Sequence, residues 1–265
     1  MIFRNLKLDY LNKGLVKLIF SNQKNKNAFS PEMISEIKNA IKVLDKSDNC
    51  KILIFTGEGD TFSSGADLVW MKESKNLNYE QNKKEAKNFT SMLSAIANFT
   101  KPTMSLVNGH AFGGALGVIA ASDFSFSTKN SKFSFSEVKL GLIPAMIAPY
   151  ILRVIGYKLT KQLFLTGELF DAKKALDIGL IDEIINIKNF EKVKSNLIRN
   201  LLIGAPQAQK NIKLFLNKIN YSKVSNKLIN ETAENISKIR VSEEAQEGLN
   251  AFLEKRKPKW KIDVS

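Results

Sequence analysis

Apolar and polar residues alternate at the start of the chain, over residues 2–10 and again over 14–20, and this pattern predicts two β-strands. Apolar residues then recur at helical spacing from Ser30 to Leu44. Ser30 is a favourable N-cap, and Pro31 suits the first helical position because the N–H group that proline lacks would be unpaired there. The start of the chain therefore predicts two strands followed by a helix.

The middle of the chain repeats this succession of strand and helix. Lys51–Thr56 is a continuous apolar run that predicts a buried strand ended by Gly57, residues 79–99 have helical spacing, and Thr103–Val107 predicts another short strand. Between residues 187 and 257 glycines become rare and helical patterns dominate. Strands that alternate with helices predict a layered α/β domain with partly parallel strands. The later helices predict an appendage that packs on this domain or on a neighbouring subunit.

Composition narrows the class of protein. With 265 residues, 44% of them hydrophobic, the chain is long enough for one large or two smaller globular domains, and no apolar run approaches the roughly 20 residues of a membrane span. The N-terminal segment lacks the apolar core and cleavage signal of a secretory peptide. Cys50 is the only cysteine, so no disulfide can form within the chain. These features predict a cytoplasmic protein with no membrane partner.

The formal charge is strongly positive, at +14, because 40 lysines and arginines face 26 acidic residues. Such a balance favours anionic partners, including nucleic acid and phosphate-bearing small molecules. Only five of the 40 basic residues are arginine, the side chain that proteins prefer for bidentate contacts to phosphates and bases. Nucleic acid is therefore a secondary hypothesis, and a solvated lysine-rich surface is the simpler interpretation.

Most familiar catalytic motifs are absent from the sequence. His110 is the only histidine, so a multi-histidine metal site or a Ser-His-Asp triad would have to use that residue or do without it. There is no phosphate-binding GxxxxGK[ST] motif, and the glycines of residues 109–114 lack the GxGxxG spacing of dinucleotide-binding loops. We therefore expect no metal and no nicotinamide cofactor.

Two loops rich in small residues remain as candidate functional segments: Phe62–Leu68 (FSSGADL) and Val107–Gly114 (VNGHAFGG). Each follows a predicted strand and presents small residues where a helix begins. Backbone N–H groups at the start of a helix are unpaired and carry partial positive charge. If the two loops face each other, their N–H groups form a two-donor oxyanion hole. Otherwise both loops are ordinary tight turns between strand and helix.

The segments FSSGADL, NGHAFGGALG and FSFSEVKLGLIP, in this order and spacing, resemble the enoyl-CoA hydratase/isomerase (crotonase) superfamily. The resemblance extends from residues 21–33 to residues 247–260. It implies an α/β fold, a crotonase-like spiral of ββα units followed by a C-terminal α-helical trimerisation region. On this basis residues 1–200 are expected to form the spiral core with the CoA and acyl sites, and residues 201–265 the helical oligomerisation region of a homotrimer or homohexamer.

The resemblance also implies a mechanism. In this family two backbone N–H groups hold the thioester oxygen of a CoA substrate, and the matching positions are Ala66 and Gly114. One acid–base glutamate of the family matches Glu137. Apolar neighbours are expected to raise the pKa of this glutamate by desolvation; they are Phe133, Phe135 and Leu140.

The chain departs from the family pattern at Gly117. The family's hydratases usually carry a second glutamate at this position, and glycine has no functional group. We expect the missing side chain to leave room for a bulkier acyl group. The runs AFGGALG, SFSEVKLGLIPAMIAPYIL and GADLVWMK most resemble the methylglutaconyl-CoA and isohexenylglutaconyl-CoA hydratase branch, which acts on 3-branched, glutaconyl-type esters. These substrates carry a second carboxylate, for which Lys139 and Arg153 are the candidate cations.

Further residues are expected, by the same resemblance, to bind the acyl-CoA substrate. Ser64 matches a position whose carbonyl contacts the adenine, and Lys26 lies in the loop that lines it. Phe252 and Lys255 match positions that reach the coenzyme from an adjacent subunit. Asp67 is more typical of a helix cap than of a catalyst. The expected substrate-binding residues are Lys26, Ser64, Gly65, Asp67, Leu68, Gly113, Gly117, Phe252 and Lys255.

The main hypothesis is therefore an enoyl-CoA hydratase that needs no cofactor, because coenzyme A is part of its substrate. Three alternatives stay open. Glu137 alone suffices for Δ3,Δ2-enoyl-CoA isomerisation. Some relatives of the glutaconyl hydratases are reported to bind RNA, although the lysines of this chain are dispersed. The glycine at position 117 also fits an inactive relative.

Overall fold

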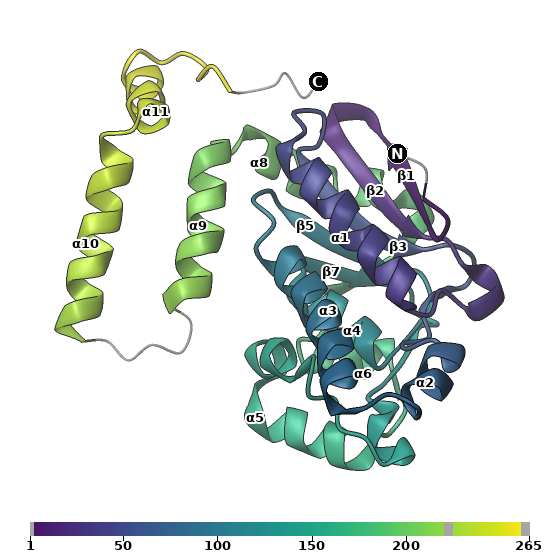
Figure 1. Cartoon of the computed structure of the whole chain (residues 1–265). Helices are drawn as coiled ribbons and strands as arrows, with labels where there is room; N and C mark the ends of the chain where they lie inside the picture. The colour runs from purple at the N-terminus through teal and green to yellow at the C-terminus, as the bar shows by residue number, and fades with distance from the viewer. Residues whose placement is uncertain (1–2, 220–224, 261–265) are drawn as a thin grey trace. The chain divides into compact units, whose positions relative to one another are not determined.

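The computed structural model describes residues 3–219 and 225–260, so residue 2 of the first predicted strand lies outside the described residues. The chain divides into two compact units. Figure 1 colours the whole chain by residue number. The first unit comprises Met1–Phe99 and Thr103–Phe190, and the second comprises Thr100–Pro102 and Glu191–Ser265. Every strand within the described part of the chain belongs to the first unit.

The first unit contains two β-sheets. The larger has six strands in the order β1-β2-β3-β5-β7-β10, and the smaller has four in the order β4-β6-β8-β9. Strand β1 pairs antiparallel with β2, and β9 pairs antiparallel with β8, whereas the other neighbours are parallel. The strands are β1 (Leu6–Tyr10), β2 (Leu15–Phe20), β3 (Ile52–Gly57), β4 (Thr61–Ser63), β5 (Thr103–Val107), β6 (His110–Phe112), β7 (Phe124–Ser127), β8 (Lys132–Ser134), β9 (Phe170–Asp171) and β10 (Glu183–Ile184).

From β3 to β8, successive strands alternate between the two sheets. Strands β3, β5 and β7 join the larger sheet, and each is followed within a few residues by a short strand of the smaller sheet, namely β4, β6 and β8. Helical segments then lead from β4 to β5 and from β6 to β7 in the larger sheet, and from β8 to β9 in the smaller one. This repeated order of two strands and a helix confirms the predicted spiral of ββα units.

Helices cover the sheets of the first unit, and α1 packs beside α3 (Figure 1). Helix α5 is interrupted at Gly156, whose φ of 74° and ψ of 169° lie outside the helical region. A short 3-10 helix, η3 (Ser136–Leu140), precedes α5. The α-helices are α1 (Pro31–Lys46), α2 (Leu68–Ser74), α3 (Tyr79–Ala97), α4 (Gly114–Ala121), α5 (Ala148–Thr166) and α6 (Ala172–Asp177).

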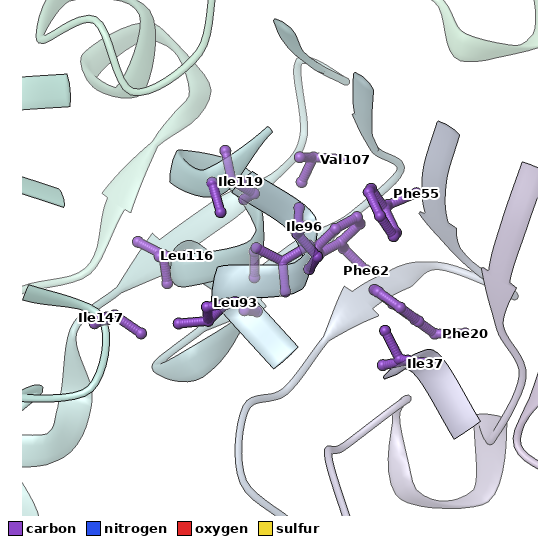
Figure 2. Packing of buried hydrophobic residues seen from close by; sticks show 14 of the residues in the cluster. Phe20, Ile37, Phe55, Phe62, Leu93, Ile96, Val107, Leu116, Ile119 and Ile147 are labelled. Carbon is purple, nitrogen blue, oxygen red and sulfur yellow. The ribbon is translucent and has the colours of Figure 1, made fainter. Parts of the chain in front are cut away.

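A buried apolar core joins these helices to the sheets. Phe20 makes edge-to-face contacts with Phe29 and Phe62, at ring-centroid distances of 5.5 and 5.3 Å. Figure 2 shows the side chains of α3 and α4 that complete this core, among them Leu93 and Leu116. Such close-packed aromatic and aliphatic contacts make the core a rigid support for the loops at the strand ends.

The long predicted elements are confirmed. The helix predicted from Ser30 is α1, and the Ser30 hydroxyl accepts a hydrogen bond from the Met33 amide at 3.1 Å. An N-cap of this kind contributes about 1 kcal/mol to helix stability. The strand predicted at Thr103–Val107 has those same bounds.

The second unit is helical in the residues that the structure describes. Its helices are α8 (Ser195–Ile203), α9 (Pro206–Ile219), α10 (Asn226–Arg240) and α11 (Glu243–Leu253), and the short α7 (Phe190–Val193) begins at the last residue of the first unit. The Glu244 carboxylate accepts hydrogen bonds from the Gln207 and Ala208 amides at the start of α9. A cavity of about 290 Å³ lies in this unit beside Trp260, and none of the predicted site residues lines it.

Candidate active site

Three short parallel strands end side by side and bring the three motif segments together. Strand β6 pairs with β4 on one side, where Ala111 lies opposite Ser63, and with β8 on the other, where Phe112 lies opposite Ser134. Because parallel strands end at the same edge of a sheet, the loops that follow them are neighbours. The three loops carry the predicted residues Ala66, Gly114 and Glu137.

The loop after β4 is held as an additional strand-like segment. The Phe29 amide donates to the Gly65 carbonyl at 2.7 Å, and the Asp67 amide donates to the Phe29 carbonyl at 3.0 Å. The Ala66 amide lies between these two anchored groups and donates no hydrogen bond within the described residues. Gly65 has a φ of 92°, and a Cβ at this position would lie 2.8 Å from the Phe112 carbonyl oxygen. Only glycine therefore lets the two loops approach this closely.

The loop after β6 presents a second unengaged amide. Gly113 has a φ of 52° and a ψ of −122°, which side chains disfavour, and its amide donates to the Ser134 carbonyl at 3.0 Å. Gly114 begins α4, so its amide has no acceptor within the helix, and no other acceptor lies among the described residues. A Cβ on Gly114 would lie 2.7 Å from Cζ of Phe89. The glycine pair thus presents backbone where side chains do not fit.

The carboxyl group of Glu137 lies against this glycine pair. Its Oε1 is 3.1 Å from the point where a Cβ of Gly113 would lie. Its Oε2 is buried and has no hydrogen-bond partner within the described residues. Burial raises the pKa of Glu137 above its ordinary value, as the sequence predicted. Of the three apolar neighbours that the sequence indicated, Phe133 and Phe135 are fully buried, whereas Leu140 is 60% exposed.

The space beside Gly117 is filled, and the expectation that this glycine leaves room for an acyl group is wrong. A Cβ on Gly117 would clash with Cγ2 of Ile147 and lie 3.1 Å from Cδ1 of Leu93. Both side chains are fully or almost fully buried, and Figure 2 shows them with Leu116 in the packed core. Gly117 is small because α3 and the start of α5 pack closely on α4, not because a ligand approaches it.

Comparison with known proteins identifies the family. The sequence profile described as enoyl-CoA hydratase/isomerase matches residues 11–263. The chain belongs to the enoyl-CoA hydratase/isomerase family. A crystal structure of an enoyl-CoA hydratase from Shewanella pealeana is 39% identical in sequence, with a TM-score of 0.93 over 97% of this chain and 96% of that chain.

Members of the enoyl-CoA hydratase/isomerase family with different names resemble the chain about equally. Crotonyl-CoA hydratase of Syntrophomonas wolfei is 28% identical over 97% of this chain and 98% of its own length. Trans-2-decenoyl-[acyl-carrier-protein] isomerase of Streptococcus mutans is 27% identical over 94% of this chain and 95% of its own length. Sequence identity therefore does not separate hydration from isomerisation.

The structure places two of the predicted coenzyme-binding positions of this family member side by side. The Ser64 amide donates to the Lys26 carbonyl at 3.0 Å, so the two loops run together. The Lys26 side chain is exposed, and the Ser64 carbonyl accepts no hydrogen bond within the part of the chain that the structure describes. The free Ser64 carbonyl offers an acceptor for an amine, and the exposed Lys26 ammonium group offers a counter-charge for a phosphate.

The Asp67 side chain is engaged in holding the loop. Its Oδ1 accepts from the amides of Val69 and Trp70 at 2.8 and 3.1 Å, and its Oδ2 accepts from Nδ2 of Asn25 at 2.9 Å. This geometry confirms Asp67 as the N-cap of α2. Leu68, the first residue of α2, is 80% exposed and is free to contact a ligand.

The remaining predicted residues are exposed. Lys139 and Arg153 have exposed side chains in the first unit. Phe252 is 81% exposed and Lys255 has a φ of 53°, and both belong to the second unit. Their predicted role in a neighbour's coenzyme site stays a prediction.

Other sites are not indicated within the described residues. These residues contain no cluster of three or more histidine, cysteine, aspartate or glutamate side chains that could hold a metal ion. His110 is exposed, and its ring stacks on Phe112 at a centroid distance of 5.9 Å. No helix in the described ranges is long and apolar enough to cross a membrane.

Sequence analysis missed Asn27, which supports the connection between β3 and β4. It is fully buried with a φ of 55°, and its Nδ2 donates to the carbonyls of Glu58 and Thr61 at 2.9 and 2.7 Å. Its Oδ1 accepts from the Asn22 amide at 3.0 Å. Asparagine tolerates left-handed backbone, so the three asparagines between residues 22 and 27 were the available signal.

Proposed function

We propose that this protein hydrates 2-enoyl-CoA thioesters, with Glu137 as the acid–base group and the amides of Ala66 and Gly114 as the oxyanion hole. The proposal rests on one observation: two unengaged backbone amides lie on adjoining loops beside a carboxyl group that has a buried, unpartnered oxygen. The names of the relatives, most of which are enoyl-CoA hydratases, support the same reaction.

The reaction follows from these groups. Glu137, in its ionised form, accepts a proton from water as the water oxygen bonds to C3 of the substrate. The electron pair of the double bond moves toward the thioester, and the resulting negative charge on oxygen is stabilised by the two amides, each typically worth about 3 kcal/mol of barrier. Glu137 then returns its proton to C2, which yields the 3-hydroxyacyl thioester and restores the carboxylate. One carboxylate serves both transfers.

We further propose a 3-branched or glutaconyl-type acyl group. The support is the resemblance of GADLVWMK and SFSEVKLGLIPAMIAPYIL to that branch of hydratases. Because Ile147 fills the space beside Gly117, the branch must lie elsewhere, and the exposed side chains of Leu68, Leu142 and Ile143 offer apolar surface for it. Lys139 or Arg153 would then pair with the distal carboxylate.

A turnover screen of the purified protein tests both levels of this proposal. Linear, 3-methyl-branched and glutaconyl-type 2-enoyl-CoA thioesters are offered separately, and water addition is followed by loss of the conjugated thioester absorbance and by mass spectrometry. We expect turnover, with the highest kcat/KM on glutaconyl-type esters. A preference for linear esters would reject the branched substrate class, and no turnover of any ester would reject hydration.

Isomerisation is the second candidate, favoured by the aliphatic surroundings of Gly117. An isomerase moves a proton between C2 and C4 and needs only one carboxylate, and the Streptococcus relative is named an isomerase. Incubation of a 3-enoyl-CoA thioester in deuterium oxide separates the reactions. Isomerisation gives a conjugated 2-enoyl thioester that gains at most exchanged deuterium and no water, whereas hydration alone leaves the 3-enoyl ester unchanged.

We also propose that the coenzyme is held by the Ser64 carbonyl and Lys26, and by Phe252 and Lys255 of a neighbouring subunit in a trimer or hexamer. The high exposure of Phe252 supports an intermolecular contact. Light scattering at micromolar concentration tests the assembly, and a monomer would reject the shared site.

No resident cofactor is proposed, since water and the thioester supply every atom of the reaction. Nucleic acid is expected to bind weakly, and only at low salt.

A further inference from the structure

Helix α2 directly follows the proposed oxyanion hole, yet little of it is buried. None of its residues within the described part of the chain is buried, and Leu68 and Val69 are 80% and 61% exposed. The Asp67 cap fixes the first turn only. A seven-residue helix has little stability of its own, so contacts of its side chains with neighbouring elements must determine where it lies.

Trp70 provides such a contact. Its Nε1–H donates to Oε2 of Glu85 on α3 at 2.5 Å, and its half-buried ring packs against the apolar core. Glu85 lies one helical turn before Phe89, whose ring meets Gly114. One face of α3 therefore supports the Gly114 loop through Phe89 and helix α2 through Glu85.

The Ala66 amide is held independently of this contact. The Gly65 carbonyl and the Asp67 amide, on either side of Ala66, are both bonded to Phe29. Movement of α2 beyond Asp67 can therefore change the positions of Leu68 and Val69 without moving the amide. Loss of the Trp70–Glu85 hydrogen bond should affect the binding of the acyl chain more than the chemical step.

We propose that Trp70 and Glu85 form a positioning pair that sets acyl-chain specificity, by holding α2 so that Leu68 and Val69 form one wall of the acyl site. This inference rests on the proposed acyl-CoA substrate, but not on whether the reaction is hydration or isomerisation. Trp70 and Glu85 take no part in the proton transfers, and they act through the two exposed apolar side chains of α2.

Trp70→Phe and Glu85→Ala test the pair, with Glu85→Gln as the matched control because glutamine keeps an acceptor oxygen for the indole. Steady-state kinetics are measured on crotonyl-CoA and on 2-decenoyl-CoA. We expect Trp70→Phe and Glu85→Ala to raise KM for the decenoyl ester about tenfold, the effect of about one hydrogen bond to a charged acceptor. Their kcat on crotonyl-CoA should stay within about twofold of wild type, and Glu85→Gln should retain the wild-type chain-length ratio.

A merely structural role predicts equal losses on both esters, and that result, or an unchanged chain-length ratio in both variants, would overturn the proposal. If Trp70→Phe fails to fold, Glu85→Ala decides alone, since Glu85 is only half-buried. If the wild type turns over neither ester, the proposal is judged instead from calorimetric Kd values for butyryl-CoA and decanoyl-CoA. In that case the Kd ratio between wild type and variants must change for decanoyl-CoA only.

Discussion

The motif resemblance implies that residues 137 and 117 match the two glutamate positions of the family's hydratases, and the structure gives these residues opposite surroundings. Glu137 has a buried oxygen without a partner and lies against the backbone of Gly113. Gly117 lies against the aliphatic side chains of Ile147 and Leu93, with no space for a side chain of its own. One position is prepared for a reacting group, and the other is part of the core.

The absence of a glutamate side chain at position 117 does not leave an empty space beside this residue. A Cβ at position 117 would clash with Cγ2 of Ile147, which fills the space beside the glycine. The packing around Gly117 therefore leaves no space for a side chain at that position. Glu137 therefore remains the acid–base group of the proposed reaction.

The largest expected effect comes from Glu137→Gln. The amide keeps the shape of the carboxyl group but cannot transfer the proton, so kcat should fall by at least about 100-fold. The midpoint of thermal unfolding should change little, because Oε2 has no partner to lose. Glu73→Gln, on the exposed surface of α2, is the matched control and should keep wild-type kcat. Activity of Glu137→Gln within a few-fold of wild type would move the chemistry to another residue.

Gly117→Glu tests the other half of the comparison. The new side chain has to displace Ile147 and bury a carboxylate, so we expect a loss of about 3 kcal/mol in the free energy of unfolding and no gain in hydration rate. Urea unfolding provides the measurement. Gly117→Ala should lose less, and Gly117→Glu combined with Ile147→Ala should recover part of the loss. A stable Gly117→Glu variant that hydrates faster than wild type would contradict the packing argument.

The raised pKa of Glu137 predicts a smaller effect, a change of stability and of activity with pH whose direction is defined. Burial favours the protonated form in the folded protein, so the folded state binds this proton more tightly than the unfolded state. Glu137 therefore makes the protein less stable as the pH rises from its pKa in the unfolded chain to its raised pKa in the folded protein. This pH dependence of stability is absent in Glu137→Gln. The kcat/KM of wild type should fall as pH decreases through the raised pKa. Matched pH titrations of unfolding and activity check both; identical unfolding profiles of wild type and variant would contradict the assignment.

The sequence predicted the larger sheet much better than the smaller one. Strand β3 is a long apolar run, and β5 has the bounds that its pattern indicates. Strands β4, β6 and β8 have three residues each, too few to show an alternating pattern, and their pairing joins segments distant in the sequence. The ββα order could be inferred only from resemblance to the family.

The candidate site, too, was predicted from the sequence only in part. The glycines at 113 and 114 predicted a close backbone approach, because a residue without a Cβ lets the backbone come near a ligand or another loop. The filling of the space beside Gly117 could not be predicted, since it depends on Ile147, which lies 30 residues later and contacts α4 only in the folded chain. Local pattern identified which residues have special backbone roles, and tertiary packing determined what surrounds them.

The smallest expected effect tests whether Asp67 replaces the missing second glutamate. Both of its oxygens already accept hydrogen bonds, from the amides of α2 and from Asn25, so its carboxylate is committed to holding the loop. Asp67→Ala should lower the free energy of unfolding by about 1 kcal/mol, the usual effect of losing an N-cap. Asp67→Asn keeps an oxygen that can cap the helix but removes the charge, so its stability and kcat should both stay near wild type. A fall of 100-fold or more in the kcat of Asp67→Asn, with stability retained, would make Asp67 the second acid–base group and end the contrast between one reacting carboxylate and one filled position.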